Sequence, residues 1–226
     1  MEIKYNRTRN GYYIDKESEI NVESFLHFLE LSITAGVIAE SIREGKETLN
    51  FISFETTGAL RGIGHLKQLL FAIRNHRKIS FMHENFETGK KRKYSLKPYL
   101  LKEYQSRWYV VGILVGLNEF RSFGIDRIEN IEVLNETFKM DDKLNPIQLF
   151  ENTIGLTYSY NKPEEVLISF KPLQAKYVKA LPLHKSQEII NETNESVTIR
   201  IKVVPNFELK QKILMLGDSV IVLKPK

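Results

Sequence analysis

The chain contains no cysteine among its 226 residues, and this absence excludes disulfide bonds, thiolate metal sites and cysteine nucleophiles. It also lacks an uninterrupted apolar run of about 18 residues, the length that a membrane-spanning helix needs. Its longest apolar runs, such as Val110–Val115, have the length of a strand. The first residues carry no apolar core of a signal peptide. We therefore expect a cytoplasmic protein with no membrane partner.

Motifs for common catalytic chemistry are missing as well. Three glycines between positions 58 and 64 lack the GxGxxG spacing, and no GxxxxGK[ST] loop is present. The five histidines are scattered without an HExxH pattern, and no serine lies in a GxSxG turn. The adjacent acids Asp141-Asp142 and Glu164-Glu165 lie beside Asn or Pro, which is typical of solvated loops. The sequence thus predicts no catalytic residue, no metal site and no cofactor, and we do not expect an enzyme.

Positive charge is abundant but unevenly distributed. The whole chain has a formal net charge of +5 and a sequence pI near 9.2. Residues 61–107 contain twelve Lys and Arg but only three Glu, a net charge of +9, so the rest of the chain is net acidic. One part of the molecule therefore carries the positive field, which favours an anionic partner there.

The first 76 residues are predicted to hold a hairpin and two helices. Ile3 and Tyr5 alternate with polar residues, and Tyr12, Tyr13 and Ile14 would form the return strand after Asn10-Gly11, a dipeptide favoured in two-residue hairpin turns. Apolar spacings of three and four predict helices over 21–43 and 63–75, with a short strand at 49–54 between them. The apolar face expected for the second helix comprises Ile63, Leu66, Leu69, Leu70 and Ile73.

Short strands dominate the next part of the chain, and five to six of them with turns between indicate a small barrel or sandwich. They are expected at 78–86, 91–97, 100–104, 108–114, 120–125 and 128–134.

A linker is expected around 141–146, and a different pattern follows it. The order strand, helix, two strands, helix and strand is that of the ferredoxin-like split arrangement. These elements are expected at 165–170, 172–180, 188–191, 196–203, 207–216 and 219–223.

The segment 107–127 has the pattern best suited to binding. If 121–127 is extended, side chains two residues apart share a face. Two guanidiniums with an aromatic ring between them suit a phosphate and a stacked base. Alternatively, Phe123 belongs to the core and both arginines extend to solvent or pair with Asp126 and Glu129. The residues alone leave both interpretations open. Those that would share the face are Arg121, Phe123, Ile125 and Arg127.

This segment resembles the WYL domain, a family named for a Trp-Tyr-Leu run that reads Trp108-Tyr109-Val110 here. Further parts of the family's pattern are present. They are Ile79–His83, with His83 in place of the usual aromatic residue, Lys97–Leu100 around a proline, and the closing Arg-x-Phe-x-x-Asp-Arg-Ile at 121–128.

The rest of the chain resembles the parts that accompany a WYL domain. Residues 3–14 resemble the wing hairpin of a winged helix-turn-helix. Pro182–Gln187, Phe207–Leu209, Gly217-Asp218 and Val222–Pro225 resemble the extension domain that commonly follows. The resemblance implies an α+β protein in four parts. These are a wing remnant (1–16), a helical linker and dimerisation region (17–76), a WYL domain with a small Sm-like β-barrel (77–140), and a C-terminal ferredoxin-like extension (141–226).

Family members are typically dimeric bacterial transcription regulators whose WYL domain binds a ligand, often a nucleic acid or nucleotide, that controls DNA binding. The resemblance gives Trp108, one position out of phase with Tyr109, a structural role. Only two residues precede Ile3, so we expect the recognition helix to be missing or to lie upstream. The implied ligand pocket comprises His83, Tyr109, Arg121, Phe123 and Arg127.

We therefore expect the ligand-sensing and dimerising part of a bacterial transcription regulator, a homodimer that reaches DNA through a missing or upstream helix-turn-helix. The alternative is a stand-alone protein that binds single-stranded oligonucleotides without promoter specificity. In that case a basic hairpin would contact phosphates nonspecifically. Its residues are Lys90, Lys91, Arg92 and Lys93.

Overall fold

The computed structural model of the chain describes residues 3–6, 11–14, 36, 40, 62–117, 119–141 and 146–225. The chain divides into two compact units, Met1–Thr57 and Gly58–Lys226. In the described part, no helix is long and apolar enough to cross a membrane.

In the first unit, β1 (Ile3–Asn6) and β2 (Gly11–Ile14) pair antiparallel, which confirms the predicted hairpin. Gly11 lies opposite Asn6 within the ladder, so it is not part of a two-residue turn as predicted. The predicted helix at 21–43 and strand at 49–54 lie outside the described residues, apart from residues 36 and 40, which are helical.

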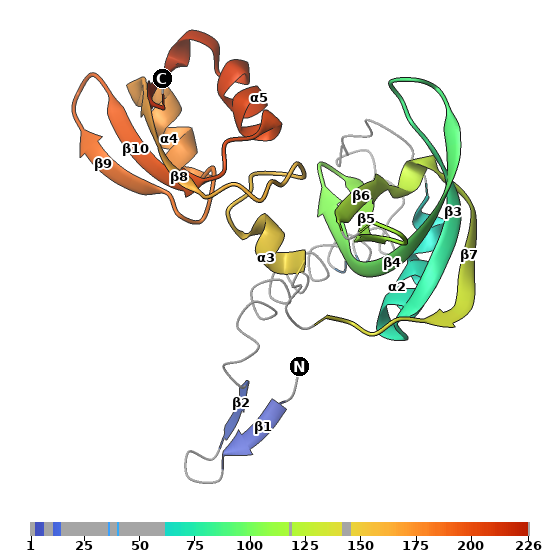
Figure 1. Cartoon of the computed structure of the whole chain (residues 1–226). Helices are drawn as coiled ribbons and strands as arrows, with labels where there is room; N and C mark the ends of the chain where they lie inside the picture. Colours follow the sequence, from blue (N-terminus) through green and yellow to red (C-terminus); the bar gives the residue numbers. More distant parts are fainter. Residues whose placement is uncertain are drawn as a thin grey trace. The chain divides into compact units, whose positions relative to one another are not determined.

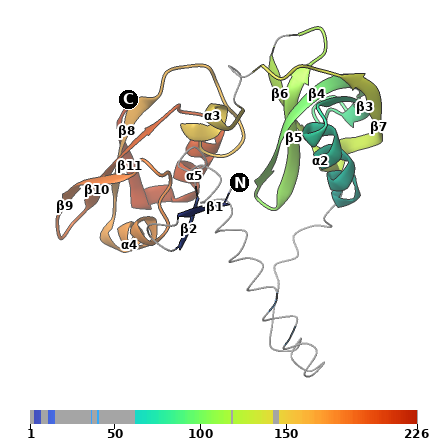
Figure 2. The same cartoon turned by 90° about the horizontal axis from the view of Figure 1, so that it is seen from below.

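The second unit begins with the 3-10 turn η3 (Ile63–His65) and helix α2 (Leu66–Arg74), which packs on a five-stranded antiparallel sheet (Figure 2). The sheet has the order β6-β5-β4-β3-β7. Its strands are β3 (Arg77–Glu84), β4 (Lys91–Tyr104), β5 (Arg107–Leu114), β6 (Phe120–Gly124) and β7 (Ile128–Thr137), with the 3-10 turn η4 (Ile125–Arg127) between the last two (Figure 1).

The sheet is bent but does not close. Among the described residues β6 and β7 are edge strands that do not pair with each other, so the expected barrel is not a closed one. The two strands expected at 91–97 and 100–104 are one strand, β4, with a register shift between Pro98 and Leu100. Proline has no N–H to donate, and the bulge absorbs this gap within a central strand.

Two apolar clusters lie on opposite faces of β5, because successive side chains of a strand alternate between faces. Val110 joins Leu69 of α2 and Phe123 in one cluster, whereas Val111 joins Tyr99 in the other. On α2, Leu69 and Ala72 are fully buried. Ile63 and Leu70, expected on the apolar face, are 40% and 50% exposed. Ile63 lies before the helix, in η3, and α2 turns a narrower stripe to the sheet than the pattern suggested.

The short helix α3 (Pro146–Glu151) begins at the last residue of the expected linker and was not predicted. Six elements follow in the predicted order, and their sheet is antiparallel with the order β11-β8-β10-β9. They are β8 (Glu164–Phe170), α4 (Pro172–Ala180), β9 (Glu188–Glu192), β10 (Val197–Val203), α5 (Phe207–Met215) and, after the 3-10 turn η5 (Gly217–Ser219), β11 (Val220–Lys224).

The core of this second sheet lies on one face only. Every second residue of β8 and β10 is buried, and both helices contribute to the same cluster, α4 through Val178 and α5 through Leu209. Asn206 caps the N-terminus of α5, and its side-chain oxygen accepts a hydrogen bond from Leu209 N at 2.9 Å. The sequence therefore places a two-layer α/β sandwich after the five-stranded sheet.

Candidate functional site

A cavity of about 540 Å³ opens where β3, β4 and β6 of the five-stranded sheet meet η4. It brings together four of the five residues predicted for a ligand pocket. We call it the basic cavity. It is lined by His83, Asn85, Phe86, Glu87, Tyr94, Leu114, Arg121, Ser122, Phe123 and Arg127.

Its inner wall is a cluster of rings that the strand register sets. Phe81 lies opposite Tyr94 in the β3–β4 ladder, and His83 follows two residues later on the same face. The ring centroids of His83 and Phe123 are 5.0 Å apart, edge to face, and those of Tyr94 and Phe123 are also 5.0 Å apart. Such contacts fix the rings relative to one another, so the wall is preformed.

Arg127 reaches the cavity by a route that the sequence did not predict. The chain is not extended up to Arg127, because β6 ends at Gly124 and η4 turns it. The turn lays the guanidinium against Gly124, where a Cβ would lie 3.0 Å from Nη2, and over the ring of Phe86, at 4.6 Å from the centroid. Among the described residues, no carboxylate forms a salt bridge with it.

Arg121 is the more exposed of the two cations. Its Nη2 lies 3.0 Å from Glu119 Oε2, and both side chains are more than half exposed. A pair of this kind contributes little to stability and is easily exchanged for another anion. The neighbouring Asp126 is held by the guanidinium of Arg107 instead.

The electrostatics of His83 follow from its position. Burial, together with the positive charge of Arg127, lowers the pKa of His83 to about 4, against a smaller opposite effect of Asp126. The imidazole is therefore neutral at physiological pH. Its Nε2 is buried and has no hydrogen-bond partner.

Unsatisfied polar atoms concentrate at this cavity. In the described part of the chain, six buried side-chain polar atoms lack a partner, and three of them belong to cavity-lining residues. Each such atom costs about 1–3 kcal/mol unless something binds it. They are His83 Nε2, Ser122 Oγ and Arg127 Nε; a fourth, Asp126 Oδ1, belongs to the adjacent residue.

Tyr109 does not line the cavity, contrary to the prediction. It lies two residues before Val111 on β5, and therefore on the face of the second apolar cluster. Trp108 packs against the first cluster, to which the cavity residue Phe123 belongs. Phe86 and Tyr94 were not predicted as lining residues. The signal for Tyr94 is its position two residues after Arg92, which places both on the same face of β4 as His83.

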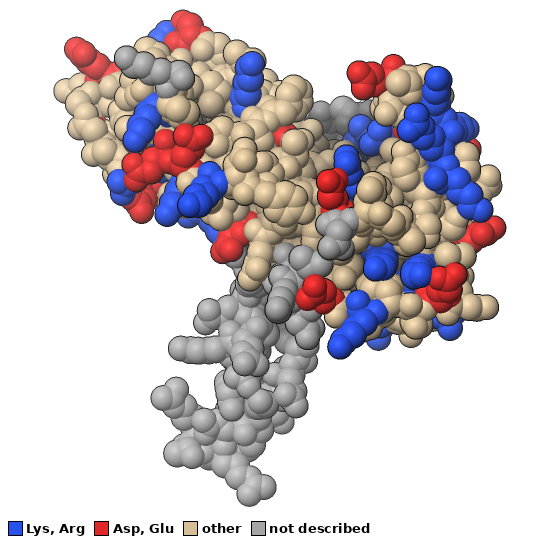
Figure 3. Space-filling view, in the orientation of Figure 1, with Lys and Arg blue, Asp and Glu red and all other residues tan. Residues whose placement is uncertain are grey.

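The predicted basic hairpin projects from the same end of the sheet, and Figure 3 shows Lys and Arg gathered there. All four residues of 90–93 are exposed. The register divides them, because Arg92 lies opposite His83 and shares its face, whereas Lys91 and Lys93 lie on the other. Lys91 Nζ is 2.7 Å from Glu129 Oε1 on that other face.

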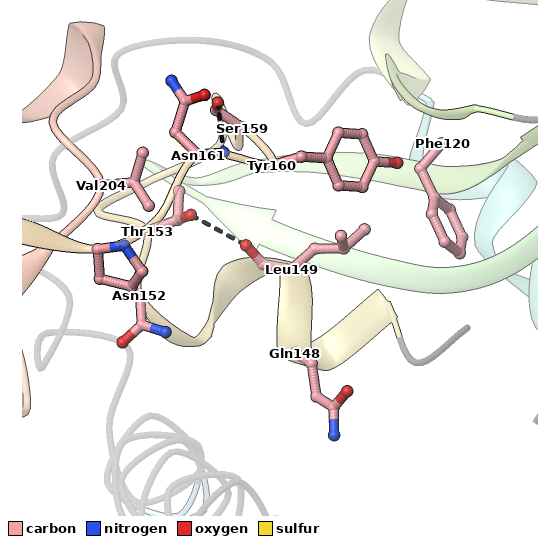
Figure 4. A pocket seen from close by; sticks show the side chains of 10 residues that line it. Phe120, Gln148, Leu149, Asn152, Thr153, Ser159, Tyr160, Asn161 and Val204 are labelled. Atoms are coloured by element: carbon pink, nitrogen blue, oxygen red, sulfur yellow. Dashed lines mark hydrogen bonds between the residues drawn. The ribbon is translucent and has the colours of Figure 1, made fainter. Parts of the chain in front are cut away.

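A second cavity, of about 280 Å³, lies around α3 and the segment after it (Figure 4). The ring of Tyr160 extends toward Phe120, with Leu149 nearby, and Tyr158 donates a hydrogen bond to the Phe120 carbonyl. None of the residues that line this cavity is charged, so it offers no cation to a phosphate. The described residues also contain no cluster of His, Asp or Glu that would hold a metal ion.

Comparisons with known proteins match two domains. The profile of the WYL domain matches residues 64–133, and that of the WCX domain matches residues 162–226. The search of curated proteins found no significant match.

Two solved structures are similar to the chain. "Proteasome accessory factor B/C (PafBC) of Arthrobacter aurescens" is 17% identical with a TM-score of 0.38, over 74% of this chain and 25% of that one. A structure described as a CRISPR Cas-related protein is 14% identical with a TM-score of 0.44, over 73% of this chain and 47% of that one. The chain therefore spans less than half the length of either protein.

Proposed function

Because the chain belongs to the WYL-domain family, with a WCX domain after the WYL domain, we propose that it is the ligand-sensing and dimerising part of a transcription regulator. In this proposal the basic cavity binds a nucleic acid or a nucleotide-like effector, and the bound effector controls DNA binding. The chain would act as a binding protein and not as an enzyme.

The observation that carries the proposal is the meeting of unpartnered polar atoms, two arginines and a ring cluster in one cavity. Arg127 and Arg121 would hold a phosphate, since one guanidinium can donate two parallel hydrogen bonds to phosphate oxygens. Phe123 and Tyr94 would offer a ring face to a base. His83, neutral and buried, would form a directional hydrogen bond to the ligand. Tyr109, on the other face, has no place in this set.

The test is a titration of a fluorescent single-stranded oligonucleotide with the full chain and with the double variant Arg121→Ala/Arg127→Ala. Two charge-assisted hydrogen bonds are lost, so affinity should fall at least about tenfold. The control, Arg74→Ala/Arg200→Ala, removes the same charge outside the cavity and should bind as the unchanged chain does. Equal affinity of the cavity variant and the control would refute the site.

A second candidate function is a stand-alone protein that binds single strands without promoter specificity, and the exposed basic hairpin favours it. The two candidate functions differ in which residues bind the single strand. If substitution of Lys90–Lys93 by Ala abolishes binding while Arg121→Ala/Arg127→Ala leaves it unchanged, the hairpin and not the cavity is the binding site.

Finer features belong to the same proposal. We infer a cytoplasmic homodimer that reaches DNA through the helix-turn-helix of a regulator, with 1–16 as the remnant of its wing and 17–76 as a helical linker and dimerisation region. The strand order β6-β5-β4-β3-β7 and the antiparallel β11-β8-β10-β9 sheet support an open Sm-like sheet in 77–140 and a ferredoxin-like domain in 141–226. Sedimentation at several concentrations tests the dimer.

A further inference from the structure

We propose that the basic cavity selects a phosphomonoester, either a nucleoside monophosphate or the phosphorylated end of a single strand, over the phosphodiester inside a strand. This inference rests on the proposed function, because it names the chemical group of the ligand at the same site. Three features of the cavity support it: its hydrogen-bonding atoms, its charge and its size.

His83 is 9% exposed, and its Nε2 has no hydrogen-bond partner. In a neutral imidazole one nitrogen donates and the other accepts. In the tautomer that carries its proton on Nε2, His83 donates to an anionic oxygen. A phosphodiester has two non-ester oxygens and a phosphomonoester has three. The monoester can therefore accept from Nε2 and still present two oxygens to a guanidinium, whereas the diester cannot do both.

Three arginines lie in the cavity or on the same face of the sheet. Arg127 comes from η4 and Arg121 from β6, and Arg92 of β4 lies on the face of His83. The acids nearby are Glu87, which lines the cavity, Asp126, which Arg107 holds, and Glu119, which pairs with the exposed Arg121. A phosphomonoester carries a charge of about −1.5 to −2 at pH 7, compared with about −1 for a diester. The half-buried Arg127, without a salt bridge to any described carboxylate, gains more from the larger charge.

The size of the cavity limits how much of a nucleic-acid strand can enter it. The cavity volume of about 540 Å³ is in the lower half of the range of about 300–1,000 Å³ found for pockets that enclose one small ligand. The ring cluster of Phe81, His83, Tyr94 and Phe123 closes its inner side. A single nucleotide fits such a space better than several, so a strand would enter by its end.

The experiment compares three short oligothymidylates of one sequence in fluorescence anisotropy with the full chain at pH 7. One has a 5′-phosphate, one a 3′-phosphate, and one a hydroxyl at both ends, with the dye on an internal base. At least one phosphorylated strand should bind about tenfold more tightly than the unphosphorylated strand, a difference of about 1.4 kcal/mol. Thymidine monophosphate should compete with it, whereas thymidine should not.

The outcomes separate this inference from the proposed function. Equal affinity for all three strands, lost in Arg121→Ala/Arg127→Ala, together with no competition by thymidine monophosphate, would overturn the phosphomonoester inference and leave the nucleic-acid site standing. Binding of no strand and of no mononucleotide would overturn both. Competition by thymidine monophosphate without any end preference would mean that free nucleotides, not strand ends, are the source of the phosphate.

Two variants test the role of His83. His83→Phe removes the hydrogen-bonding nitrogen, and the preference for the phosphorylated strand should fall to less than about threefold. His83→Gln keeps a donor and an acceptor and should retain the preference. A folded His83→Phe variant, checked by its melting temperature, with a full tenfold preference would show that the imidazole does not read the phosphate.

Discussion

At the scale of single residues, His83 combines deep burial with an unpartnered ring nitrogen in a cavity that also holds Arg127. A protonated imidazole there would be poorly solvated and would repel the guanidinium. The folded state therefore disfavours the charged ring, and protonation and folding oppose each other.

This opposition predicts a pH dependence of stability. The pKa of His83 is about 4 in the folded state and about 6.5 in the unfolded state, so the unfolded chain binds the extra proton between these values. The free energy of unfolding should fall as pH drops from 6.5 to 4, by up to about 3 kcal/mol from this residue. Urea unfolding of the unchanged chain and of His83→Gln measures the difference. Parallel pH profiles for the two proteins would contradict the prediction.

The residue scale also shows where sequence patterns succeed and fail. The alternation rule placed Arg121 and Phe123 correctly relative to β6, but it placed Arg127 with them through an extended strand that does not exist. The turn of η4 depends on contacts with residues far away, since Gly62 and Ile125 approach so closely that a Cβ on Gly62 would lie 2.7 Å from the Ile125 carbonyl carbon. No local pattern records such an approach.

At the scale of elements, the periodic strands and helices were predictable and the irregular joints were not. α4 was predicted at its observed bounds, because Pro172 suits the first turn of a helix. α3 was not predicted, because six residues make fewer than two helical turns and show no clear apolar repeat. The acids and Asn before it are typical of a loop. The bulge at Pro98 was predicted as a break between two strands, because proline is unusual inside a central strand.

The alternation of β4 gives a prediction with a matched control. Arg92 shares the face of His83 and Lys93 does not, although both are exposed and carry one positive charge. Arg92→Ala should weaken binding of a short single strand and lower the slope of log affinity against log salt by about 0.7, the value for one phosphate contact. Lys93→Ala should change neither. Equal effects of the two variants would mean that the hairpin binds without regard to face.

Glu208 joins α5 to the segment before β8, and its carboxylate gives a second prediction for an element. Its Oε1 accepts hydrogen bonds from Leu156 N at 3.1 Å, Thr157 N at 2.8 Å and Thr157 Oγ1 at 2.9 Å, and the residue is 6% exposed. Glu208→Ala leaves these donors unpartnered and should cost about 3 kcal/mol of stability. The exposed Glu188, paired with Arg200, serves as control, and Glu188→Ala should cost less than about 1 kcal/mol. Urea unfolding compares the two; a similar loss for both would contradict the role given to Glu208.

At the scale of the whole molecule, the sequence predicted the uneven distribution of charge, and the structure connects it to the site. The stretch with a net charge of +9 supplies β3 and β4, which contribute His83 and Tyr94 to the wall of the basic cavity, and the cavity's two arginines follow that stretch in the sequence. The rest of the chain is net acidic. An anionic ligand is thus drawn to one end of one sheet.

The unit 58–226 holds both sheets, and this gives a prediction for thermal unfolding. Tyr158 donates a hydrogen bond to the Phe120 carbonyl of β6, and the adjacent Thr157 donates one to Glu208 of α5. The segment before β8 is thus bonded to both parts of the unit, so we expect one cooperative transition for both. A ligand present at about 100 times its Kd should stabilise the whole unit by about 2.7 kcal/mol. Two separate transitions in calorimetry, with only one moved by the ligand, would contradict this coupling.

The most direct test of the basic cavity as a nucleic-acid site is ultraviolet crosslinking of the full chain to a short oligothymidylate, with the crosslinked residues mapped by mass spectrometry. Crosslinks should map to Phe86, Tyr94 or Phe123, the rings that line the cavity, and should disappear in Arg121→Ala/Arg127→Ala. Crosslinks that map only to rings elsewhere in the chain, and persist in the double variant, would contradict it.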